Sequence, residues 1–82
     1  MMRDRKGREV RKGDMVMLNT GEIGNTASEP RKMFDGKVNF WYVMIKIGNY
    51  SRDSYSGEFI RLPRKRKKLE QELTIYKLEG KL

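Results

Sequence analysis

The amino-acid sequence predicts a mainly β fold, a small barrel of four to five antiparallel strands. Three observations predict it: four or five short runs of strand composition, a long polar stretch after the first run, and glycine-marked turns. A chain of 82 residues suffices for one domain, and it buries only about 60 to 65% of the surface that its unfolded form exposes. We therefore expect a flexible basic arm over residues 1–9 and a single domain with a thin core over residues 10–82.

The first strand is expected over Met15–Leu18, directly after a turn at Gly13-Asp14. The stretch Asn19–Lys32 that follows is polar and contains two glycines and one proline. A loop of this length in a compact domain is usually functional or mobile, unless it hides a short element. Glu22-Ile23 is the candidate for such an element.

The strongest local signal is a β-hairpin over Met33–Ile47 with its turn at Asp35-Gly36. Aspartate and glycine tolerate the positive φ angles that a two-residue hairpin turn demands. Alternate residues of the second strand point to opposite faces. One face carries Val38, Phe40, Tyr42 and Met44, and the other carries Trp41, Val43, Ile45 and Ile47. Because both faces are apolar, we expect this strand at the centre of the sheet.

A second polar loop is expected over Gly48–Gly57, and residues 58–63 have the alternation of a strand. Pro63 closes that strand because proline has no N–H to donate to a ladder. The large rings Phe40, Trp41 and Phe59 are expected in the core, as a thin core requires bulky apolar side chains.

Two structures compete for the C-terminal stretch. Leu69, Leu73 and Tyr76 have helical spacing. However, cations at the start of such a helix and glutamates towards its end oppose the helix macrodipole. Residues 73–76 also have strand composition. These observations favour a closing strand over about residues 73–78, with a short helical turn near 66–72 as the alternative.

Two motifs carry a resemblance to a known fold. "VRKGDMVML", Val10–Leu18, followed by "DGKV", Asp35–Val38, resembles the opening of SH3-like small barrels of the KOW and Tudor kind. The resemblance covers about half of the chain. It implies a binding module that contacts RNA, DNA or peptides through its loops and one open face.

The charge distribution predicts an anionic partner. The chain carries a net charge of +8, of which residues 1–12 contribute +4 and residues 61–68 contribute +6, while residues 13–60 and 69–82 each contribute −1. The second basic segment contains Arg61, Arg64, Lys65, Arg66, Lys67 and Lys68. Clustered cations gain affinity for nucleic acid by releasing condensed counterions. The alternatives are a merely solvated charge run and, for "PRKRKK" in a eukaryotic source, a nuclear localisation signal.

Two further groups of residues are candidates for nucleic-acid contact. The N-terminal arm carries Arg3, Arg5, Lys6, Arg8, Arg11 and Lys12, which either follow a phosphate backbone or belong to a disordered terminus. In the expected loop, Tyr50, Arg52 and Tyr55 are placed to meet phosphates and unpaired bases.

Composition argues against several other functions. The chain has no cysteine and no histidine, and no Ser, Thr or Lys stands in a recognisable nucleophilic arrangement, so we expect no enzyme. We expect no cofactor and no metal, since Glu70 and Glu72 supply too few oxygen ligands. The longest apolar run, Phe40–Ile45, is far shorter than the roughly 20 residues of a membrane span. We therefore expect a cytoplasmic protein that does not bind a membrane, or a nuclear protein if the source is eukaryotic.

The sequence thus predicts a non-catalytic module that binds RNA or DNA with weak sequence preference. The alternative is a protein-interaction or regulatory module that docks on an acidic surface of a partner protein. The first prediction depends on the basic segment 61–68 having no counter-charges within the molecule.

Overall fold

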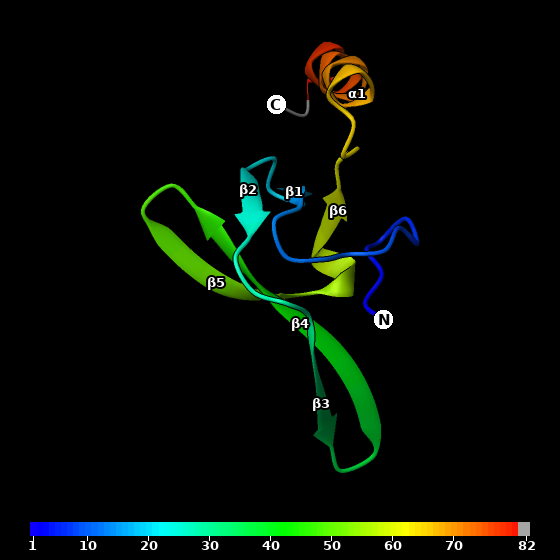
Figure 1. Cartoon of the computed structure of the whole chain (residues 1–82), viewed down its shortest axis with the longest axis vertical. Coiled ribbons are helices and arrows are strands. Elements are labelled where there is room, and N and C mark those ends of the chain that lie inside the picture. Colours follow the sequence, from blue (N-terminus) through cyan, green and yellow to red (C-terminus); the bar gives the residue numbers. More distant parts are fainter. Residues whose placement is uncertain (81–82) are drawn as a thin grey trace.

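The computed structural model describes residues 1–80 and confirms a mainly β fold, with six antiparallel strands in one open sheet and a C-terminal helix (Figure 1). In chain order the elements are β1 (Met15–Leu18), β2 (Ile23–Thr26), β3 (Arg31–Asp35), β4 (Val38–Ile47), β5 (Tyr50–Tyr55), the 3-10 turn η1 (Ser56–Glu58), β6 (Phe59–Arg61) and α1 (Arg66–Leu78).

The sheet is organised around the long strand β4. Its C-terminal half pairs with β5 on one edge and with β2 on the other, while its N-terminal half pairs with β3. β2 and β3 follow one another along the same edge, with Thr26 opposite Ile45 and Arg31 opposite Tyr42. β2 also pairs with β1, and β1 pairs with β6. The expectation of a central apolar strand is therefore confirmed for β4.

The core consists of two apolar clusters on opposite faces of β1. Because side chains alternate along a strand, Val16 and Leu18 point to one face and Met15 and Met17 to the other. The first cluster contains Met2, Val10, Val16, Leu18, Val43, Ile45 and the fully buried Phe59, with Trp41 and Ile47 packed against it. The second contains Met17, Ile60, Leu62 and Tyr76, with Met15, Leu69 and Leu73 packed against it.

The expected closing strand over residues 73–78 is wrong, because this segment belongs to α1. Leu69, Leu73 and Tyr76 form the apolar face that the helix places on the second cluster. Burial of this face offsets the unfavourable charges at the helix ends, which contribute only about 0.3 to 1 kcal/mol each. The helical spacing was the correct signal.

The other differences concern loops and the N-terminus. The expected loop over residues 48–57 contains β5, which the pairing with β4 stabilises. The hairpin turn consists of Gly36-Lys37, since Asp35 already pairs with Val38, and only Gly36 has a positive φ, of 63°. Residues 1–9 do not behave as a free arm. Met2 is 1% exposed within the first cluster, and Asp4 is also buried.

Candidate functional site

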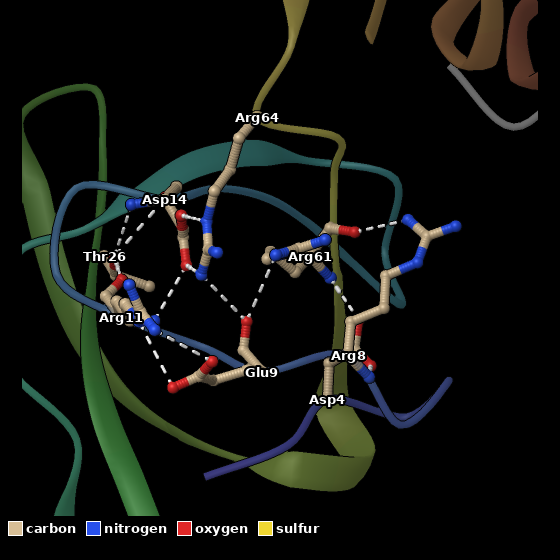
Figure 2. A network of polar contacts seen from close by, with 8 residues as sticks. All are labelled: Asp4, Arg8, Glu9, Arg11, Asp14, Thr26, Arg61 and Arg64. Atoms are coloured by element: carbon tan, nitrogen blue, oxygen red, sulfur yellow. Dashed lines mark hydrogen bonds and ion pairs between the residues drawn. The ribbon is translucent and has the colours of Figure 1, made fainter. Parts of the chain in front are cut away.

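The turn before β1 supplies a counter-charge for Arg64. The buried Asp14 accepts hydrogen bonds from Arg64 Nε at 2.8 Å, from Arg64 Nη2 at 3.1 Å and from the Arg11 backbone N–H at 2.7 Å (Figure 2). The Asp14 N–H in turn donates to Thr26 Oγ1 at 2.8 Å. Burial alone would raise the pKa of Asp14, but the hydrogen bonds and the charge of Arg64 lower that pKa below its ordinary value. Arg64 is therefore the ion-pair partner of a carboxylate at neutral pH.

Arg61 is held by the N-terminal segment. Its backbone N–H donates to Asp4 Oδ2 at 2.5 Å, and its Nη1 donates to the Glu9 carbonyl oxygen at 3.4 Å. Arg64 Nη2 donates to the same carbonyl at 3.1 Å. Among the described residues, Arg61 Nε is buried without a hydrogen-bond partner. The Arg61 guanidinium thus lies partly inside the network of Figure 2.

Arg8 connects the N-terminal segment to β6 and α1. Its Nη1 donates to the Arg61 carbonyl oxygen at 2.7 Å, and its Nη2 lies 3.2 Å from Glu72 Oε1. Tyr76 Oη donates to the same Glu72 oxygen at 2.5 Å. Burial of Glu72 acts to raise the pKa of its carboxyl, but the hydrogen bonds from Tyr76 and Arg8 outweigh burial, and the pKa is lowered. Arg8 therefore fixes the helix against the sheet.

Arg11 has a counter-charge two positions away. Its Nη2 lies 3.1 Å from Glu9 Oε2, and its Nε also donates to that carboxylate. The hydrogen bond and the charge of Arg11 lower the pKa of Glu9. Arg11 remains largely accessible, with 62% of its side chain exposed, so this pair is a weak, solvated one.

The predicted residues Tyr50, Arg52 and Tyr55 lie on β5, and no hydrogen bond or ion pair of the described chain joins them to residues 61–68. Tyr50 Oη donates to Glu22 Oε2 at 2.8 Å, which raises the pKa of the tyrosine. Arg52 Nη2 lies 2.6 Å from Glu58 Oε2. Tyr55 is about half exposed. These residues lie on β5, which pairs with β4, whereas the basic segment follows β6, which pairs with β1.

Three of the exposed cations without an acidic partner in residues 1–80 are lysines at the start of α1. Lys65, Lys67 and Lys68 are exposed and have no acidic partner within residues 1–80. Lys12 is exposed in the same way. Arg66 pairs with Glu70 at 3.2 Å, but both side chains are so exposed, 91% and 65%, that the pair contributes little.

The expectation that the basic segment has no internal counter-charges is therefore wrong for Arg64 and for Arg66, while its three lysines have no acidic partner within residues 1–80. Sequence reasoning missed the acidic partners Asp14 and Glu72, which lie 50 and 64 positions from their arginines. The sequence did offer one sign that acids of this molecule bind its basic segments: Asp4 and Glu9 lie inside the basic N-terminal segment. An acid inside a basic stretch is well placed to bind the backbone or an arginine of its own segment.

Residues 1–80 contain no group of three or more acidic side chains arranged to hold a metal ion. Within the same residues, no helix is both long and apolar enough to cross a membrane. Comparison of the chain with protein-family models, with curated proteins and with solved structures gives no match.

Proposed function

We propose that the protein is a non-catalytic nucleic-acid-binding module that neutralises phosphates with the basic start of α1. The observation that carries this proposal is the set of uncompensated charges there. Lys65 is the N-cap residue, and Lys67 and Lys68 lie in the first turn, which contains no acidic residue and no side-chain cap. The first N–H groups of a helix lack intrahelical partners, and the macrodipole is positive at this end. A phosphate would satisfy both the N–H groups and the lysines.

Lysine chemistry supports weak sequence preference. An ammonium group acts as a mobile point charge, whereas specific base contacts need rigid, planar donors. Arg8 and Arg64 each donate from two side-chain nitrogens to one carboxylate, that of Glu72 and that of Asp14. The proposed site therefore consists of Lys65, Arg66, Lys67 and Lys68, with Lys12 and Arg11 as neighbours in the N-terminal turn. Cytoplasmic localisation remains part of this proposal.

We also propose that the sheet is of the SH3-like small-barrel type. Support comes from the order of neighbouring strands, β5, β4, β2, β1 and β6, in which β6, the last strand of the chain, pairs with β1, the first strand of the chain. Within residues 23–35, β2 pairs with both β1 and β4, and β3 continues the pairing along β4. Both features are typical of a short chain that forms a small antiparallel sheet of this type.

The test is to measure binding of fluorescent RNA, single-stranded DNA and duplex DNA at several salt concentrations. Each phosphate contact on duplex DNA contributes about −0.9 to the slope of log K against log salt. Changing Lys65, Lys67 and Lys68 to Gln should reduce that slope by up to about 2.7 if each contacts one phosphate. The stability of the fold should stay nearly unchanged, since exposed charges contribute little.

The matched control is the triple change of Lys32, Lys37 and Lys46 to Gln. These lysines are also exposed and have no ion pair in residues 1–80, although Lys32 Nζ lies 5.9 Å from the centre of the Trp41 ring, and their loss lowers the net charge by the same amount. Equal weakening by both triple variants would mean that net charge alone drives binding, without a site at α1. A binding constant that does not depend on salt would reject phosphate neutralisation altogether.

A further inference from the structure

The hairpin of β3 and the N-terminal half of β4 extends away from the body of the protein (Figure 1). Every residue from 31 to 39 is exposed. Residues that pair across two antiparallel strands share a face, so the register places Met33 with Phe40, and Asp35 with Val38. We call the face that carries Arg31, Met33, Asp35, Val38, Phe40, Tyr42 and Tyr55 the outer face.

The outer face is largely apolar, and its end near the hairpin turn is exposed. Val38 is 62% exposed and Met33 is 47% exposed. Phe40 is half-buried and packs against the Tyr55 ring in an edge-to-face arrangement, with centroids 5.5 Å apart and planes at 71°. A two-stranded ribbon without a covering layer is marginally stable in water, and a contiguous exposed apolar patch on a soluble protein marks an interaction site.

The charges of the outer face are balanced, unlike those of the rest of the molecule. Arg31 lies two residues to one side of Met33, and Asp35 lies two residues to the other side. Neither has an ion pair within residues 1–80, and Arg31 is the one arginine of that part whose side chain makes no hydrogen bond. A face with one cation, one acid and an apolar centre does not match a line of phosphates. It is complementary to itself.

We propose that the outer face is a homodimer interface. The two-fold axis lies between the two ribbons and runs perpendicular to β3 at the level of Met33. Such an axis places Arg31 of each copy opposite Asp35 of the other, because both lie about 7 Å from Met33 along the strand. Met33, Val38 and Phe40 of the two copies then cover one another in two sheet layers about 10 Å apart.

This arrangement also keeps the strongest charges apart. α1 and its lysines lie at the opposite end of the molecule from the ribbon (Figure 1), and the molecule is 43 Å long. Repulsion between the two copies is therefore screened, since the Debye length is about 8 Å at physiological ionic strength. The overlap of two short ribbons is smaller than a standard interface of about 800 Å² per partner. The dimer is accordingly weak and forms at high micromolar concentrations.

The test is sedimentation equilibrium of the full chain at about 10 µM to 1 mM. The proposal predicts a rise from the monomer mass of 9.7 kDa towards twice that value. Changing Met33 and Val38 together to Ser should weaken the dimer at least tenfold. Phe34→Ser is the matched control, because Phe34 is 64% exposed on the same ribbon but pairs with Asn39 on the opposite face. This variant should associate like the unmodified protein.

A charge exchange tests the position of the axis without altering apolar surface. Arg31→Asp alone should weaken the dimer, and the double variant Arg31→Asp with Asp35→Arg should restore it. A monomer mass at every concentration would overturn the proposal, as would a dimer that the Met33 and Val38 serines leave unchanged. If the double exchange fails to restore association, the assigned two-fold axis is overturned. A chain that stays monomeric but loses nucleic-acid binding with the serines would identify nucleic acid as the occupant and refute the dimer.

Discussion

The ion pair between Asp14 and Arg64 offers a quantitative test of the tertiary structure. In Asp14→Asn, an amide oxygen in the place of Oδ2 can still accept the Arg11 N–H and Arg64 Nη2, but the bond from Arg64 Nε to Oδ1 and the negative charge of the carboxylate are lost. The carboxylate is buried, with 6% of its side chain exposed, whereas 41% of the Arg64 side chain is exposed. The pair is therefore intermediate between a buried and a surface ion pair. Solvent screening reduces its contribution to the free energy of unfolding. We expect a coupling free energy of about 1 to 2 kcal/mol.

The assay is a double-mutant cycle with Asp14→Asn, Arg64→Gln and both changes together. Urea unfolding followed through Trp41, the single tryptophan, gives the free energy of unfolding of each variant. A loss of 1 kcal/mol corresponds to a decrease of about 4 to 8 °C in Tm for a domain of this size. A coupling energy below about 0.3 kcal/mol would refute our view that this pair holds the basic segment on the sheet.

The same pair predicts a dependence on pH and on binding. Because the pKa of Asp14 is lowered in the folded state, its stabilisation is present above the ordinary value of 3.8 and is lost as the pH falls through the folded pKa. The stability difference between wild type and Asp14→Asn should therefore shrink when unfolding is measured near pH 3. Asp14→Asn also removes the carboxylate that neutralises the charge of Arg64. If the proposed nucleic-acid function holds, the salt slope should become steeper by about 0.9.

Two further substitutions test the packing of β2 and of α1. Gly24→Ala should destabilise the protein by at least about 2 kcal/mol, because the added Cβ would lie 2.6 Å from the Lys46 carbonyl oxygen. The control is Gly57→Ala, whose added Cβ would meet nothing within 4 Å. This control should be nearly neutral in the same urea unfolding assay. Tyr76→Phe should cost about 1 to 1.5 kcal/mol at pH 7 by removing the hydrogen bond that Tyr76 Oη donates to Glu72 and the one that it accepts from Lys6 Nζ. Since the bond to Glu72 is one cause of the lowered Glu72 pKa, the cost should decrease near pH 3, and an unchanged cost there would contradict the assignment.

Local patterns were sufficient to predict β1, β6 and the hairpin between β3 and β4, because strand composition and turn chemistry act within a few residues. The turn itself lies one residue later than predicted. Asp35 completes the ladder with Val38. Gly36 is then the one residue of the two-residue turn that has a positive φ. β5 was not predicted, because its polar sequence has no apolar alternation and its ladder with β4 stabilises it.

The candidate site was predicted only in part. The position of the basic segment follows from the sequence, and its lysines do lie in water. Which arginines are neutralised depends on acids that are distant along the chain, such as Asp14 for Arg64 and Glu72 for Arg8. Such partners are defined only once the chain has folded.

By itself, the sequence determined the β-rich class, the two basic segments and the alternation of apolar residues along β4, since these depend on residue type and spacing alone. The tertiary structure decided that residues 66–78 form a helix, because the second cluster offers its leucines a surface to cover. It also decided that Met33 and Val38 remain exposed. Spacing can assign a side chain to one face of a strand, but only the arrangement of the whole chain determines whether another layer covers that face.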